Sequence, residues 1–97
     1  MNMQAVHNEI GAMIRANRIK KNMTQLELSK ALGYDSMQFV SLMERGLSKA
    51  PANVIGKLII VLDIPEKKIT GMLKKNFEVK LNAEIAAGVE DATTQLN

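Results

Sequence analysis

The side chains in this sequence that are best suited to chemistry are amides and hydroxyls between residues 25 and 48. The amide of Gln38 matches the N7 and N6 edge of adenine, accepting and donating at once, so it is the best candidate for reading a base. Ser41 can hydrogen-bond to several base edges. Leu42 can contact only a thymine methyl group or pack on a neighbouring side chain. These residue types could read base edges if one helix presented them together to a groove of DNA.

The residues that catalysis or metal binding would need are missing from the pattern. His7 is the only histidine, and the chain has no cysteine, so thiolate sites, disulfides and histidine clusters are excluded. No phosphate-binding glycine loop, serine–histidine–acid set or carboxylate pair emerges, because the acids are scattered along the predicted helices. We therefore expect no enzyme, no cofactor and no metal site.

Length and charge favour one small domain with a polyanionic partner. A chain of 97 residues buries roughly 60–65% of its unfolded surface, which allows one core. Residues 1–80 hold 13 bases and 7 acids, a net charge of +6, whereas residues 81–97 hold 3 acids and no base. The longest apolar run, Leu58 to Leu62, is far below the ~20 residues that span a bilayer. With no secretory signal visible, we expect a cytoplasmic protein without a membrane partner.

Apolar residues recur with helical periodicity throughout, and no alternating pattern predicts a strand. Thr24 and Glu27 form a capping box that opens the second helix, in which Leu28, Ala31 and Leu32 should face inward. Ser36 or Asp35 is expected to cap the third helix. Five helices are predicted. The first spans Val6–Lys21, the second about eight residues after Thr24, the third Met37–Arg45, the fourth Ala52–Leu62, and the fifth begins at Pro65. Asn22, Gly33 and Gly46 are expected to end the first three.

Three motifs at fixed spacing resemble a known family. They read Ile10-Gly11-x-x-Ile14-Arg15-x-x-Arg18, Met23-Thr24-Gln25-x-x-Leu28-x-x-x-Leu32-Gly33 and Ser41-x-x-Glu44-Arg45-Gly46. Over about residues 8–73 the chain resembles the Cro/C1-type (xenobiotic-response-element-type) helix-turn-helix of phage and bacterial repressors. The resemblance implies an all-α, lambda-repressor-like DNA-binding domain of five helices. We expect it to span residues 1–75, followed by a C-terminal extension over residues 76–97.

The resemblance also implies roles for individual residues. Gln25 would donate to a phosphate and buttress the third helix, and Arg18 would pair with Glu44 to orient that helix. Met37 occupies a position where related repressors place a polar reader, so it either contacts DNA or covers Tyr34. We expect Phe39 to contact the turn.

The loop after the third helix should meet the sugar–phosphate backbone. Arg45, Ser48 and Lys49 flank this loop, and we expect Arg45 and Lys49 to neutralise phosphates without reading sequence.

Two positions depart from the family pattern. Gly33 and Glu44 are eleven residues apart, which makes the turn one residue longer than usual. Asn17 stands where the family usually has leucine, so the core of the first helix is weaker there or Ile19 compensates.

The extension carries an apolar stripe in which Phe77, Leu81, Ile85 and Val89 recur every four residues. This spacing predicts an amphipathic helix to about residue 92. The stripe either forms a homodimer, binds another protein or packs back on the core, and the helix-five region around Ile64 is an alternative dimer surface.

The leading hypothesis is a sequence-specific double-stranded DNA-binding repressor. One recognition helix covers few base pairs, so we expect a homodimer on a near-palindromic operator with half-sites about 34–36 Å apart. One alternative is an antitoxin that regulates its own operon and binds a toxin through the tail. Another is a protein-interaction domain without DNA binding, which the apolar Met37, Phe39 and Leu42 would favour.

Overall fold

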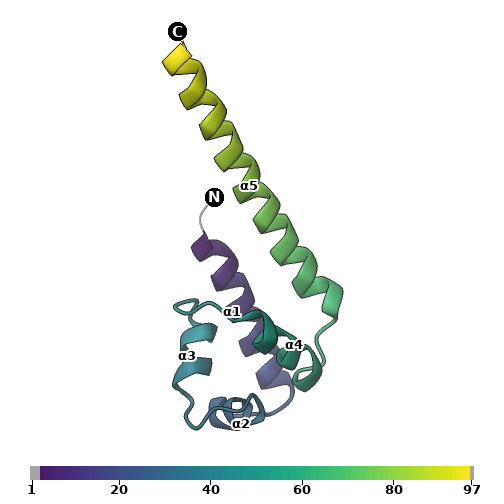
Figure 1. The fold of residues 1–97 in the computed structure, drawn as a ribbon. Helices are drawn as coiled ribbons and strands as arrows, with labels where there is room; N and C mark the ends of the chain where they lie inside the picture. The colour runs from purple at the N-terminus through teal and green to yellow at the C-terminus, as the bar shows by residue number, and fades with distance from the viewer. Residues whose placement is uncertain (1–2, 97) are drawn as a thin grey trace.

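The computed structural model describes residues 3–96, which form five α-helices and no strand. They are α1 (Met3–Lys20), α2 (Gln25–Ala31), α3 (Gln38–Glu44), α4 (Ala52–Val61) and α5 (Glu66–Leu96). The first four helices and the start of α5 form a small globular body, and the rest of α5 projects from it as a rod (Figure 1). The molecule accordingly measures 60 × 25 × 19 Å. The expected all-α architecture with a C-terminal helix is confirmed.

Local signals define most of the helix ends. Asn22 adopts φ 56° after α1, which is the left-handed conformation that amide side chains tolerate. The capping box at α2 is complete: the Glu27 N–H donates to Thr24 Oγ1 at 3.0 Å, and the Thr24 N–H donates to Glu27 Oε1 at 2.9 Å. Gly33 and Gly46, with φ 95° and 72°, lie just past α2 and α3 as expected.

The start of α3 differs from the expectation by one residue. Met37, not Ser36, is the N-cap of α3, and its side chain makes no capping hydrogen bond. The hydroxyl of Ser36 still accepts from the Gln38 N–H, at a long 3.4 Å. The extra residue in the turn therefore shifts the cap without removing the serine from the helix start.

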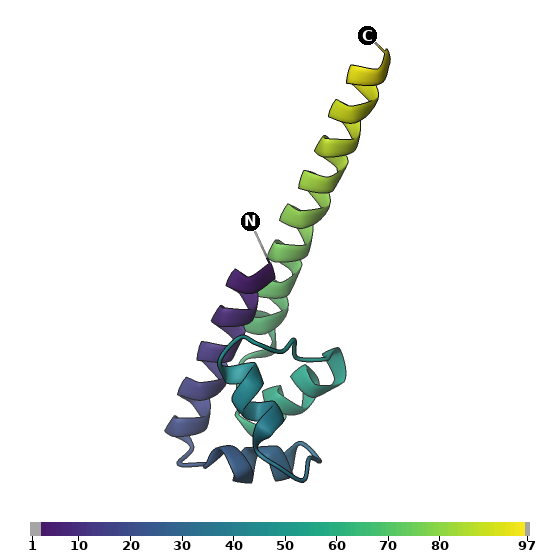
Figure 2. The same cartoon turned by 90° about the vertical axis from the view of Figure 1, so that its left-hand side faces the viewer.

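The helix α5 continues without a break across the expected boundary at residue 75 and ends four residues later than predicted from the stripe. Asp63, at φ 55°, makes the turn after α4, and Pro65 precedes the first residue of α5. Both views show α1 lying beside the first part of α5, while the distal part stands clear of the other helices (Figures 1 and 2).

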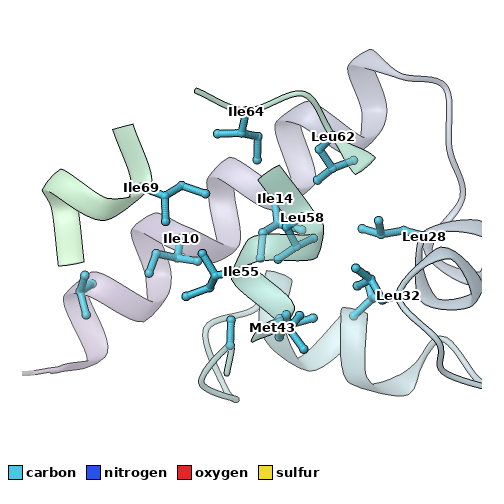
Figure 3. Packing of buried hydrophobic residues seen from close by; sticks show 14 residues of the cluster. Ile10, Ile14, Leu28, Leu32, Met43, Ile55, Leu58, Leu62, Ile64 and Ile69 are labelled. Atoms are coloured by element: carbon cyan, nitrogen blue, oxygen red, sulfur yellow. The ribbon is translucent and has the colours of Figure 1, made fainter. Parts of the chain in front are cut away.

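The core lies where all five helices meet (Figure 3). Ile14 and Leu58 are fully buried at its centre. Around them pack side chains from every element: Val6, Ile10, Leu28, Leu32, Val40, Met43, Ala50, Val54, Ile55, Leu62, Ile64 and Ile69. The residues of α5 that join this cluster stop at its first turns, so the body holds only the beginning of the rod.

One expectation about the core, the inward orientation of Ala31, was wrong, and one of the two alternatives for Asn17 is excluded. Ala31 is exposed, and Ser29 is the residue of α2 that is buried beside Leu28. The buried hydroxyl of Ser29 has no hydrogen-bond partner in the described part of the chain. Ile19 is also exposed, so it does not compensate for Asn17. Instead, the Asn17 amide donates to the Met13 carbonyl oxygen at 2.8 Å, which satisfies the polar group within α1.

The helix α1 approaches the end of α3 closely at Gly11. A Cβ atom on Gly11 would lie 2.6 Å from the Glu44 carbonyl oxygen and closer still to that of Met43. Both obstructing atoms are backbone, so α3 would have to move to admit a methyl group.

We predict that Gly11→Ala lowers the free energy of unfolding by about 1–3 kcal/mol, the usual cost of overpacking. The matched control is Gly56→Ala in α4, where nothing lies within 4 Å of a Cβ atom. That change should stabilise the protein by about 0.5–1 kcal/mol because alanine favours a helix. Urea denaturation of both variants measures the difference, and equal effects would contradict the close approach.

Candidate nucleic-acid interface

The helices α2 and α3 are joined by a turn that two aromatic rings hold together. The rings of Tyr34 and Phe39 lie with centroids 4.8 Å apart and planes tilted by 60°, an arrangement that aromatic pairs favour. Phe39 also packs against the core. This confirms the expected contact of Phe39 with the turn and orients the first turn of α3.

The helix α3 has one buried and one outward face. Val40 and Met43 point into the core, whereas Gln38 is exposed and Ser41 and Leu42 are half-buried. Because Gln38, Ser41, Leu42 and Arg45 are spaced by three, four and seven residues, they share one side of the helix. Arg45, the C-cap, donates from Nε to the Ser41 carbonyl oxygen at 3.3 Å. Three of the expected base readers and one expected phosphate contact therefore lie together.

A buried cluster of polar groups ties α3 to α1 and α2. The Arg18 guanidinium donates two hydrogen bonds to the Glu44 carboxylate in a side-on arrangement, from Nε to Oε2 at 2.6 Å and from Nη2 to Oε1 at 3.1 Å. The Gln25 amide donates to the same Oε1 at 3.1 Å, and Arg18 Nη1 donates to the Met23 carbonyl oxygen at 2.8 Å. The side chains of Arg18 and Glu44 are only 12% and 3% exposed. The expected structural pair and the buttressing contact of Gln25 are both present.

A second contact, which the sequence analysis missed, fixes the end of α3. The Gln4 amide donates to the Gly46 carbonyl oxygen at 2.7 Å and to Asn8 Oδ1 at 2.9 Å. A Cβ atom on Gly46 would collide with Asn8 Oδ1, so the stop residue of α3 lies directly against α1. The glycine within the first predicted helix, Gly11, was the one available sign that another backbone approaches α1 closely.

The loop residues Ser48 and Lys49 lie apart from the buried cluster. They line a groove of about 550 Å³ between the loop, α1, α4 and α5. Ser48 is half-buried and Lys49 exposed, while Met37 at the start of α3 is exposed. The expected site residues thus form two groups, one on α2 and α3 and one on the loop that follows α3.

The capping box also lowers the pKa of the Glu27 carboxyl group. The hydrogen bond from the Thr24 backbone N–H, with a further contribution from the Thr24 hydroxyl, holds the pKa of Glu27 below its ordinary value. This lowered pKa means that the carboxylate stabilises α2 above the pKa of the unfolded chain. The contribution is lost as the pH falls through the folded pKa.

We predict that Thr24→Ala raises the pKa of Glu27 part of the way to its ordinary value, because the backbone hydrogen bond survives while the hydroxyl is lost. A pH titration followed by NMR at the Glu27 carboxyl carbon measures the shift. An unchanged pKa would mean that the hydroxyl plays no part.

We predict that Arg18→Met lowers the free energy of unfolding by ~3–5 kcal/mol, because Glu44 would remain buried without its partner. Arg15→Met is the matched control on the same helix, since Arg15 is exposed, and it should cost less than about 0.5 kcal/mol. Adding Glu44→Leu to Arg18→Met should recover much of the loss, as measured by chemical denaturation. Equal effects of the two arginine variants would show that the ion pair does not hold α3.

The comparisons with known proteins agree with this geometry. A helix-turn-helix family model (HTH_3) matches residues 14–69, more than half of the chain and the whole of α2, α3 and α4. A search of curated proteins found no match. In the described residues, no helix has the length and apolar character to cross a membrane. The chain belongs to the Cro/C1-type (xenobiotic-response-element-type) helix-turn-helix family of DNA-binding transcription regulators.

Proposed function

We propose that this protein is a repressor that binds a near-palindromic operator as a homodimer, inserting α3 into the major groove. The observation that supports this most directly is the outward face of α3, where Gln38 is exposed above a helix locked by the Arg18–Glu44 pair. A short polar face on a rigidly held helix is what major-groove reading requires. Occupation of the operator would then block transcription.

The proposed base contacts come from the first half of α3. Gln38 is the reader of adenine, since its amide N–H can donate to N7 while its amide oxygen accepts from the N6 amino group, which makes a bidentate pair. Ser41 lies one turn further and contacts a neighbouring base edge, and Leu42 contacts a thymine methyl group. The exposed Met37 contacts a thymine methyl group or the sugar at the edge of the site.

The proposed phosphate contacts surround this face. Gln25 donates one amide hydrogen to Glu44, which leaves its second amide hydrogen for a phosphate oxygen. Arg45 lies at the end of α3, and Ser48 and Lys49 on the loop extend the row. These groups set the position of the protein on the duplex without reading its sequence.

The homodimer supplies a second half-site at one helical turn or a multiple of it. The net charge of +6 on residues 1–80 suits this interface with DNA. Membership of a DNA-binding family counts against the alternative of an interaction domain without DNA binding. An antitoxin would use the same DNA contacts and differ only in its protein partner.

We predict that Gln38→Ala relaxes the sequence preference at one adenine of each half-site. Selection of bound sites from random DNA with the parent protein should return a near-palindrome with that adenine. The variant should lose about 1–3 kcal/mol of discrimination there while keeping its affinity for nonspecific DNA. A Gln38→Ala variant that selects the same adenine as strongly as the parent would contradict the assignment.

We predict that Arg45→Ala and Lys49→Ala each reduce the slope of log affinity against log salt concentration by about 1.8, because each removes one phosphate contact, equivalent to about 0.9, from each of the two copies. Lys67→Ala at the exposed start of α5 is the matched control and should leave the slope unchanged. Fluorescence anisotropy titrations at several salt concentrations measure the slopes. A slope that is unchanged in either variant rejects that residue as a phosphate contact.

A further inference from the structure

The distal part of α5 exposes a row of large apolar side chains. Phe77, Leu81, Ile85 and Val89 are 67%, 43%, 57% and 62% exposed, although they lie on one side of a well-formed helix. This part of α5 stands clear of the other helices in both views (Figures 1 and 2). A contiguous apolar row of this kind on a surface marks an interaction site.

The row begins inside the groove beside the body. Phe77 and Leu81 form part of the groove wall on α5, and Ile10, Met43, Ile55 and Leu73 add apolar side chains from three other elements and the base of α5. Ile85 and Val89 lie farther along α5, beyond the groove. The row and the groove share Phe77 and Leu81, and they therefore make one continuous apolar surface.

The four-residue spacing makes this row oblique to the helix axis. Because an α-helix has 3.6 residues per turn, each step of four residues turns the row by about 40°. A second helix that packs along such a row crosses the first at about 50°, instead of running parallel to it as in a coiled coil. One end of the second helix then leaves α5 and lies over the groove.

The charges indicate which end that is. Lys49 and Lys80 line the groove together with one acid, Glu84, and the first half of α5 carries five lysines against two acids, Glu66 and Glu78. The second half of α5 carries Glu84, Glu90 and Asp91 and no base over residues 81–97. An acidic helix end is attracted to this groove, whereas the basic first half of another α5 would be repelled.

We propose that the groove receives the acidic second half of α5 from a second copy of this chain, so that the two α5 helices cross antiparallel. The inference rests on the homodimer proposed above and names its interface. Because a two-fold pair is reciprocal, each copy fills the groove of the other. Phe77 of one copy then lies near Val89 of the partner, and Leu81 near Ile85.

The antiparallel direction also pairs opposite charges on one flank of the row. Lys80 and Glu84 both line the groove, so they lie on the same flank of the apolar row. In an antiparallel two-fold pair, like flanks meet with their directions reversed, which places Lys80 of each copy beside Glu84 of the other. In a parallel pair this flank would meet the opposite flank, where Glu78, Asn82 and Ala86 lie, so Lys80 and Glu84 would not face each other.

Sedimentation equilibrium of the full chain tests the surface. The parent should have a mass twice 10.7 kDa, and Ile85→Arg should be monomeric or weaken dimerisation at least tenfold. Ile60→Arg is the matched control, because Ile60 is 80% exposed on α4 and outside both the row and the groove. Circular dichroism should show each variant folded. A monomeric parent, or an Ile85→Arg variant that dimerises like the parent, overturns the proposal.

A distance measurement tests the direction. Since the chain has no cysteine, Leu96→Cys provides a single site for a spin label. If the helices cross near residue 83, the label at residue 96 lies 13 residues, about 20 Å, from the crossing in each copy. In an antiparallel pair the two labels lie on opposite sides of the crossing and should be about 40 Å apart. In a parallel pair the same ends would lie less than about 25 Å apart, and that result overturns the antiparallel arrangement.

A mixing experiment tests the charge pairs. Lys80→Glu and Glu84→Lys should each weaken the homodimer, and an equimolar mixture should recover it, because each copy then offers the charge that the other lacks. Each variant also loses the charge pair between residues 80 and 84 within its own helix, and mixing does not restore that pair. Recovery on mixing therefore reports contacts between the two copies. A mixture no tighter than either variant alone would overturn the Lys80–Glu84 contact.

These results separate the interface from the DNA contacts. If the interface is wrong but the proposed function is right, Ile85→Arg should bind the selected operator with the parent's affinity and the Gln38-dependent base preference. If the DNA contacts are wrong, the parent should still dimerise through α5 while Gln38→Ala leaves site selection unchanged.

Discussion

The position of α3 depends on one buried ion pair. A helix of seven residues is too short to be stable alone, so its direction must come from contacts with its neighbours. Glu44 at its end receives two hydrogen bonds from Arg18 and one from Gln25, which links α3 to both α1 and α2. Desolvation offsets much of the attraction in such a pair, so its main effect is to disfavour other orientations of α3.

The backbone contacts around this pair make the constraint directional. Gly11 lets α1 approach the last carbonyl groups of α3, and Gly46 lets the chain turn directly against Asn8. At the other end of α3, the Tyr34 and Phe39 rings hold the turn. With both ends of α3 held and Val40 and Met43 buried, the accessible face of α3 is the one that bears Gln38 and Arg45. Rigidity and exposure of that face thus have the same cause.

What could be predicted from the sequence was mainly local. Thr24 with Glu27, Asn22 and Gly33 define helix ends through contacts within a few residues, and these were confirmed. The inward place of Ser29 and the exposure of Ala31 depend on how α2 tilts in the core, which periodicity does not specify. The contact of Gln4 with Gly46 joins residues 42 positions apart, and no local signal announces it. The pairing of Arg18 with Glu44 came from the family resemblance alone.

Packing within the body does not explain what stabilises the rod formed by α5. Most helical stability in proteins comes from packing an apolar face, yet α5 leaves the four large apolar side chains of its row, Phe77, Leu81, Ile85 and Val89, exposed. Its apolar row begins at a groove that the loop after α3 helps to form, through Ser48 and Lys49. A second copy in that groove would therefore bury the row and contact the same loop for which phosphate contacts are proposed. Helix stability, dimer formation and the spacing of the two recognition helices would then depend on a single surface.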